Sequence, residues 1–168
     1  LKRIIKEDKG VLSITPDTFK LDVNDRLKDD FSFKKKDDNS WVYQENINRK
    51  SYVYLVGGGH VGLATAKLFQ TLDFEVTMFD DRKNLNTFEE NNYSAHKKII
   101  DYKDIANHIR TGDNTYIVIL THGYQADRLI FSKLLPNDYK YIGLLGSKAK
   151  INAMFKTMIA DGCDKEQL

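Results

Sequence analysis

The sequence has almost no cysteine: Cys163 is the single one among 168 residues. One thiol cannot build an intramolecular disulfide framework or a metal site made of cysteines alone, and the scarcity fits a reducing compartment. No apolar run reaches the roughly eighteen residues that a membrane-spanning helix needs, and the start of the chain does not resemble a signal peptide. We therefore predict a cytoplasmic protein without membrane association.

An excess of charge is also missing, because 26 lysines and arginines against 24 aspartates and glutamates give a formal charge of +2 at pH 7. Near neutrality argues against a dedicated nucleic-acid surface. No histidine or carboxylate spacing indicates a hydrolytic metal site, so we predict no metal centre. The length allows one main domain with a small appendage. We interpret the chain as a fragment, because Leu1 falls within an apparent strand.

In residues 1–50, apolar and polar side chains alternate in short runs. Alternation with a period of two is typical of strands, and Lys9-Gly10 and the segment from Asp37 to Ser40 supply turns. We predict a small β-hairpin region, the tail of an N-terminal domain, with residues 46–50 as a polar linker. The expected strands are 3–6, 10–14, 19–23, 31–35 and 41–44.

From Ser51 to Leu168, the sequence predicts alternating strands and helices. Such alternation indicates an α/β fold, a doubly wound parallel sheet of about five strands that is Rossmann-like. Gly112 and Gly162 are expected to end helices. The first helix is expected to bury Val61, Ala64, Leu68 and Leu72, and the last Ile151, Met154, Phe155, Met158 and Ile159. The expected strands are 52–56, 74–79, 98–101, 116–120 and 139–145, and the later helices are 104–110, 125–135 and 148–160.

The pattern Gly57-x-Gly59-x-x-Gly62 directly follows the first of these strands. In such a loop, Gly57 permits the tight turn, Gly59 lets a ligand phosphate approach the backbone, and Gly62 lets the helix pack closely on the strand. The helix N-terminus offers unpaired N–H groups and the positive end of its dipole to an anion. The residues predicted to bind a phosphorylated ligand here are Gly57, Gly58, Gly59, His60, Val61 and Gly62.

Polar side chains also follow the other strands, and ligands of open parallel sheets bind at these carboxyl ends. Asp80 lies about twenty residues beyond the glycines, where this motif has a ribose-binding acid. Arg82 is a candidate for an extra phosphate, and His60 and His122 are candidate catalytic residues. The remaining predicted ligand contacts are Thr121, His122, Asp127, Gly146, Ser147 and Lys148.

Several of these residues also have a structural interpretation. Arg82 fits a surface salt bridge, Asp127 fits the favourable end of its helix dipole, and Ser147 is a natural N-cap for the last helix. His96, in a polar loop, and His108, in a short helix, are expected at the surface.

Three segments together resemble the xanthine dehydrogenase accessory family, the XdhC/CoxI-like proteins. They are Val56 to Gly62 with Phe79 to Arg82, Leu120 to His122 with Asp127, and Tyr141 to Lys148. The resemblance spans about residues 53–168. It implies a Rossmann-like C-terminal domain in a protein that binds the molybdenum cofactor, molybdopterin, and helps to insert it into xanthine dehydrogenase-type molybdenum hydroxylases. A cofactor-sulfurating enzyme and a second copy of the chain are further candidate partners.

Three functions remain open from the sequence. The first is the cofactor chaperone that the resemblance implies. The second is an NAD(P)-dependent oxidoreductase, with Asp80 on the ribose and hydride transfer near His122. The third is a nucleotide sensor without catalytic activity. A dehydrogenase also needs a substrate pocket and a proton-transfer group, and this unit offers little beyond His60 and His122 to build them. That shortage favours a binding module.

Overall fold

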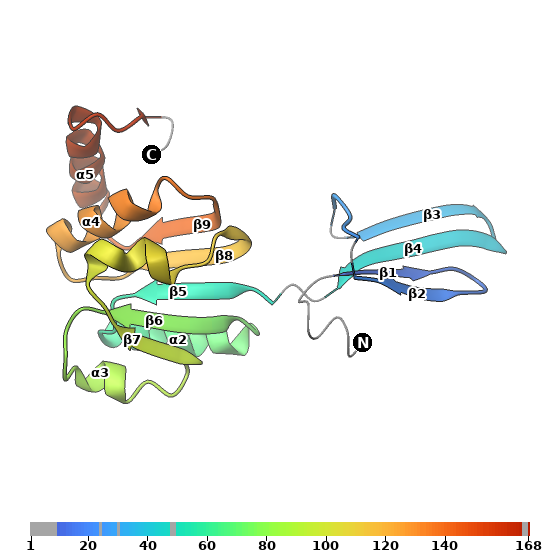
Figure 1. Ribbon diagram of the computed structural model, residues 1–168, viewed down its shortest axis with the longest axis horizontal. Helices are drawn as coiled ribbons and strands as arrows, with labels where there is room; N and C mark the ends of the chain where they lie inside the picture. The colour runs from blue at the N-terminus through green and yellow to red at the C-terminus, as the bar shows by residue number, and fades with distance from the viewer. Residues whose placement is uncertain (1–9, 24, 30, 48–49, 166–167) are drawn as a thin grey trace. The chain divides into compact units, whose positions relative to one another are not determined.

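The computed structural model describes residues 10–23, 25–29, 31–47, 50–165 and 168. It divides into two units, Leu1–Lys50 and Ser51–Leu168, each with its own sheet (Figure 1). The strand expected at residues 3–6 lies outside the described part.

The first unit contains a four-stranded antiparallel sheet in the order β2-β1-β4-β3. The turn expected between Asp37 and Ser40 joins β3 to β4. Gly10 was expected both in a turn and at the start of strand 10–14; it pairs with Ile47 and begins β1, so the strand is confirmed and the turn is not. Strand β4 continues through part of the expected linker. Among the described residues of this unit, Val11 is the only fully buried apolar side chain. The strands are β1 (Gly10–Ile14), β2 (Phe19–Asp22), β3 (Phe31–Asp37) and β4 (Ser40–Ile47).

The second unit contains a five-stranded sheet in which all neighbours are parallel. Its order, β7-β6-β5-β8-β9, means that the chain starts in the middle, runs to one edge, and then crosses back to the other (Figure 1). The predicted doubly wound, Rossmann-like fold is thus confirmed. The strands are β5 (Tyr52–Val56), β6 (Glu75–Asp80), β7 (His96–Ile99), β8 (Gly112–Ile119) and β9 (Tyr139–Leu144).

In the part of this unit that the structure describes, four of the five helices coincide with predicted ones. The short α3 was not expected, because four residues show no apolar period. Gly112 does not end a helix as expected; it begins β8 with a φ of +133°, and η1 already ends at His108. Gly162, with a φ of +97°, follows the end of the last helix as expected. The helices are α2 (His60–Thr71), α3 (Asn86–Glu89), the 3-10 helix η1 (Tyr102–His108), α4 (Tyr124–Leu134) and α5 (Lys148–Ala160).

The core of the second unit has two layers, one on each face of the sheet. The central strand β5 is buried along its whole length and supplies both: Tyr54 and Val56 face one cluster, and Val53 and Leu55 face the other. Side chains of η1, α4 and α5 complete the first cluster, and those of α2 and α3 complete the second. This period of two on a strand buried on both sides is what a central parallel strand requires.

The predicted burial of α2 is wrong. Leu68 and Leu72 are 65% and 64% exposed, and the buried residues are Gly62 and Ala66. The reason is the distance between helix and strand: a methyl group on Gly62 would overlap the carbonyl oxygen of Gly57. Only small residues fit at this contact, so the larger apolar residues face outward. On α5, Met154 and Met158 are buried as predicted, but Ile159 is exposed.

Candidate functional site

Residues that follow β5, β6, β8 and β9 line a cleft of about 780 Å³. Strands β5 and β8 are the pair at which the strand order reverses, which is where open α/β sheets bind ligands. The lining residues are Gly59, His60, Val61, Arg82, Asn84, Leu85, Asn86, Thr87, Leu120, Thr121, His122 and Leu145.

Two glycines close the loop after β5 by backbone packing. Gly57 has a φ of +120°, and a Cβ there would come within 2.6 Å of the Leu120 carbonyl oxygen. Its N–H donates to the carbonyl oxygen of Phe79 at 2.8 Å, which ties the loop to β6. Gly62 packs against Gly57, as described above. The tight turn and the close packing expected at these positions are therefore present.

Gly59 differs from these two glycines. A Cβ at this position would meet no atom within 4 Å, so the protein itself leaves the space beside it open. Gly59 is the N-cap residue of α2, and no side chain caps this helix within the described residues. Gly59, His60 and Val61 all line the cleft. The N–H groups and the positive dipole end of α2 thus face a space that an anion can enter.

The Gly58 peptide is held from both sides. Its N–H donates to Asp80 Oδ2 at 2.7 Å, and its carbonyl oxygen accepts from Thr87 Oγ1 at 2.6 Å. Phe88 packs on the same glycine, since a Cβ there would lie 2.6 Å from Phe88 Cδ2. The sequence did not reveal Thr87 and Phe88, because they lie in a polar stretch without a period. These contacts hold the Gly58 peptide in place without a ligand.

Buried Asp80 and exposed Arg82 form an ion-paired clamp beneath the loop. Asp80 Oδ1 accepts from the backbone N–H and from Nε of Arg82, both at 2.9 Å, and Oδ2 accepts from the Arg82 guanidinium at 2.8 Å. Burial would raise the pKa of the Asp80 carboxyl, but the hydrogen bonds from Arg82 and Gly58 outweigh it and lower the pKa below its ordinary value.

The pairing of Asp80 with Arg82 affects two ligand contacts that the sequence predicts, because both side chains are already engaged. Asp80 is fully buried, and both carboxylate oxygens already accept hydrogen bonds. The predicted ribose contact would require Asp80 to release the glycine loop. Arg82 lines the cleft, but its guanidinium is paired with Asp80, which matches the salt bridge that was the structural interpretation of this residue.

A second buried carboxylate lies behind the end of β8. Thr121 Oγ1 donates to Asp127 Oδ1, and Lys150 Nζ donates to Asp127 Oδ2. Asp127 is fully buried in the first turn of α4. It therefore orients Thr121, which lines the cleft, and joins α4 to α5. Sequence reasoning singled out Lys148 and missed Lys150, because only the fold brings Lys150 to this carboxylate.

Six of the predicted residues line the cleft. The others lie in the glycine loop, behind it or outside the cleft. Gly57, Gly58 and Gly62 shape the loop, and Asp80 and Asp127 support it from behind. Gly146, Ser147 and Lys148 do not line the cleft; Ser147 caps α5 by accepting from the Lys150 N–H at 3.2 Å. His96 and His108 are exposed as expected, although His96 lies in β7 and not in a loop. The six at the wall are Gly59, His60, Val61, Arg82, Thr121 and His122.

Five lining residues besides Thr87 were also missed. Asn84, Leu85 and Asn86 follow β6 a few residues beyond the predicted acid, and Leu120 and Leu145 are the apolar residues directly after β8 and β9. Their place just beyond strand ends is the one sequence signal that would have pointed to them.

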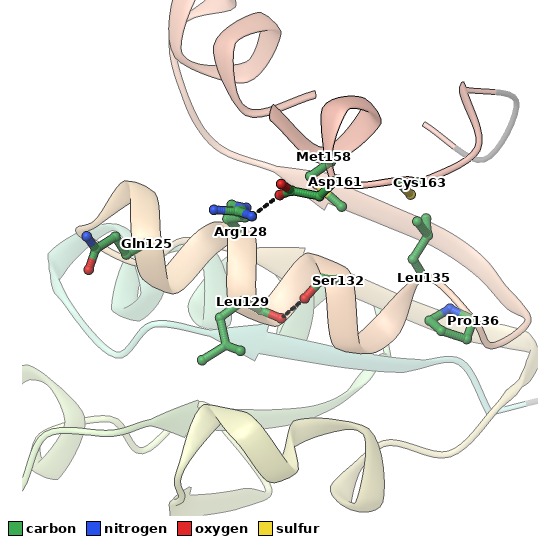
Figure 2. A pocket seen from close by; sticks show the side chains of 9 residues that line it. All are labelled: Gln125, Arg128, Leu129, Ser132, Leu135, Pro136, Met158, Asp161 and Cys163. Carbon is green, nitrogen blue, oxygen red and sulfur yellow. Dashed lines mark hydrogen bonds and ion pairs between the residues drawn. The ribbon is translucent and has the colours of Figure 1, made fainter. Parts of the chain in front are cut away.

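A second cavity of about 600 Å³ lies between α4 and α5 and the residues after α5 (Figure 2). The ion pair between Arg128 and Asp161 spans it, and Cys163 contributes to its wall. It contains none of the residues that the sequence singled out as ligand contacts.

Nowhere among the described residues do three or more His, Cys, Asp or Glu side chains gather in a way that could hold a metal ion. Likewise, none of the helices in this part of the chain has the length and apolar character needed to cross a membrane.

The strand order, the glycine turn and the helix N-terminus at the crossover define a Rossmann-like domain. Residues 53–168 match the family model of the XdhC Rossmann domain, and the chain belongs to this family. The predicted resemblance is thus confirmed. No curated protein matches the chain significantly.

One similar solved structure is a protein from Bacillus halodurans, described as a xanthine dehydrogenase. The TM-score is 0.72 at 15% sequence identity, and the match covers 92% of this chain and 53% of that one. At this identity the likeness shows a shared fold. This chain spans about half the length of that protein.

Proposed function

We propose that this chain acts in an accessory protein that binds the molybdenum cofactor and assists its insertion into a xanthine dehydrogenase-type enzyme. Membership of the XdhC Rossmann domain family supports a xanthine dehydrogenase-type enzyme as the client. One observation supports a ligand with a phosphate group: the uncapped N-terminus of α2, with open space at Gly59, faces the cleft. Such a site takes a phosphate group, and the cofactor carries one on its pterin.

The residues of the cleft fit such a ligand. The backbone N–H groups of Gly59, His60 and Val61 would hold the phosphate. Thr121, whose hydroxyl proton is donated to Asp127, would accept a hydrogen bond from a polar edge of the pterin, and His122 would supply another hydrogen bond. The volume of about 780 Å³ is within the usual range for sites of small molecules. The bound cofactor would bring the redox chemistry of its molybdenum, whereas this chain would bind and orient it.

A dinucleotide is the competing ligand, and the clamp beneath the loop argues against it. An NAD site of this type needs a free acid for the ribose, and Asp80 is buried and engaged with Arg82 and Gly58. For NADP, the Arg82 guanidinium that would meet the extra phosphate is paired with Asp80. A nucleotide sensor would use the same phosphate site. The proposal therefore needs a test that separates pterin from nucleotide.

The test is an anaerobic equilibrium titration of the protein with molybdenum cofactor, with NAD(H) and NADP(H) as competitors. We expect the cofactor to bind and the dinucleotides not to displace it. Tight dinucleotide binding that excludes the cofactor would overturn the proposal. Delivery is tested in a separate experiment. A cofactor-free xanthine dehydrogenase-type enzyme is incubated with the loaded protein or with free cofactor, and the activity that it gains is compared.

Two glycine variants make the titration specific to the helix N-terminus. Gly59→Ala adds a methyl group into open space, so the fold should persist while the ligand phosphate is pushed away. We expect at least tenfold weaker binding. Gly123→Ala is the matched control, because Gly123 is also an N-cap residue with no atom within 4 Å of an added Cβ, and it does not line the cleft. Equal losses in both variants would contradict the assigned site.

A further inference from the structure

The small sheet of the first unit has one strongly apolar face. Residues that pair across an antiparallel sheet point to the same side. Ile14 pairs with Phe19 and with Tyr43, and Tyr43 pairs with Phe33. The neighbouring pairs extend the same side in both directions. This aromatic face consists of Leu12, Ile14, Phe19, Leu21, Phe31, Phe33, Trp41 and Tyr43.

The aromatic face is open to solvent. Phe19, Phe31 and Phe33 are 69%, 61% and 56% exposed, and its other members are half-buried. The opposite side of the sheet is largely polar and includes hydrogen bonds from Gln44 to Ser13 and from Ser32 to Gln44. An uncovered apolar area of this kind marks an interaction surface.

The rings on this face are arranged side by side. Phe31 stacks with Tyr43 at 6.5 Å between ring centroids, and Phe33 lies 6.2 Å from Trp41. Despite these contacts, Phe31 and Phe33 remain more than half exposed. A broad apolar sheet surface is best covered by a second sheet, as in a β-sandwich.

We propose that the aromatic face packs against the aromatic face of a second copy of this chain. The charges on the face favour this partner. Lys35, beside Trp41, lies at one end, where it also pairs with exposed Asp38. Glu45, beside Phe31, lies at the other end and also accepts from the Tyr43 hydroxyl. A two-fold axis perpendicular to the strands brings Lys35 of each copy toward Glu45 of the other. The same surface is therefore complementary to itself in charge as well as in apolar character.

The area of the face fits a dimer of moderate affinity. With about 200 Å² for a phenylalanine side chain, the three exposed phenylalanines alone would lose on the order of 350 Å² per copy. The five half-buried members add to this. The two copies together approach the roughly 1,200 Å² at which stable interfaces begin. The second sheet would also supply the core that this unit lacks, since Val11 is its only fully buried apolar side chain among the described residues. The dimer does not depend on the ligand of the cleft.

The first experiment combines sedimentation equilibrium with tryptophan fluorescence. Trp41 is the only tryptophan of the chain and lies on the proposed interface. We expect a dimer at high concentration, and a red shift of the Trp41 emission on dilution, with the same midpoint in both measurements. A monomer at every concentration would overturn the proposal. This holds both if a quencher reaches Trp41 and if another part of the chain covers it.

The second experiment uses variants of the full chain. Phe33→Glu places a charge on the aromatic face and should raise the dissociation constant of the dimer at least tenfold. Lys34→Glu, on the opposite side of the same strand, changes the net charge even more and should leave the dimer unchanged. A dimer that survives Phe33→Glu with Trp41 emission independent of concentration would place the interface elsewhere and refute the proposal.

A charge exchange tests the orientation of the two copies. Lys35→Glu and Glu45→Lys should each weaken the dimer, and the double variant should regain most of the affinity. Far-ultraviolet circular dichroism identifies any variant that fails to fold. In that case the emission shift of the wild-type Trp41 still decides the question. A double variant weaker than either single variant would exclude this orientation.

Discussion

Asp80 links the glycine loop to β6 through its side chain. It accepts hydrogen bonds from the Gly58 N–H and from Arg82 while fully buried. Asp80→Asn should therefore lower the free energy of unfolding by about 2–3 kcal/mol, because hydrogen bonds to a buried charge are lost. Urea unfolding at pH 7 measures this value. Asp81→Asn, at the exposed neighbour, is the control and should have almost no effect.

The same clamp makes stability depend on pH. The folded pKa of Asp80 is lower than that of the unfolded chain, which is near 3.9. The carboxylate therefore stabilises the fold above about pH 4, and this contribution is lost as the pH falls through the folded pKa. Wild-type protein should lose stability in acid more steeply than Asp80→Asn, as urea midpoints at several pH values below 5 would show. Parallel curves would mean that Asp80 is not the responsible group.

The glycines of the loop should respond differently to the same substitution. Gly62→Ala places a methyl group against the backbone of Gly57, which cannot easily yield, and should cost about 1–3 kcal/mol or more. Gly59→Ala should leave the stability almost unchanged. Thermal unfolding of the two variants side by side gives the comparison. Similar losses in both would show that the space beside Gly59 is not open.

At the scale of secondary structure, the strands were predictable and the packing of the helices was only partly so. Buried strands such as β5 and β8 are short apolar runs bounded by polar or glycine residues, so the sequence located them to within a few residues. For α2, the pattern favoured the face with Leu68 and Leu72. Packing instead selected Gly62 and Ala66, because the short connection from β5 brings the helix very close to the sheet.

The candidate site, too, was only partly predictable from the sequence. Strand ends and the glycine spacing located the cleft from sequence, because these features are local. Two supporting contacts were not foreseeable. Thr87, which donates to the Gly58 carbonyl oxygen, and Lys150, which donates to Asp127, come from segments that only the fold brings near. Neither Thr87 nor Lys150 belongs to a spacing pattern that the sequence would reveal.

The exposed side and the packed side of α2 should respond differently to substitution. Leu68→Glu lies on the exposed side and should change the free energy of unfolding by less than about 0.5 kcal/mol. Ala66→Leu puts a larger side chain into the packed side and should destabilise by about 1–3 kcal/mol. Chemical denaturation of both variants measures the difference. A large loss for Leu68→Glu would mean that another surface covers this side of the helix.

For the whole molecule, the two units differ in what stabilises them. Both core clusters belong to Ser51–Leu168. The second unit should therefore unfold cooperatively by itself, and the first should depend on its partner sheet. Trp41 reports only on the first unit, since the second has no tryptophan. We expect its fluorescence transition in urea at a lower concentration than the loss of helical circular dichroism, and only the former should depend on protein concentration. Coincident transitions would show one cooperative unit.

The fixation of Gly58 between Asp80 and Thr87 has a kinetic consequence for any ligand of the cleft. A surface that is complete before the encounter requires no rearrangement, so the observed association rate should rise linearly with ligand concentration and show no plateau. Differences in affinity among ligands would then appear as differences in residence time. A carrier with this property would load at a rate set by encounter and would hold each ligand for a time set by its contacts.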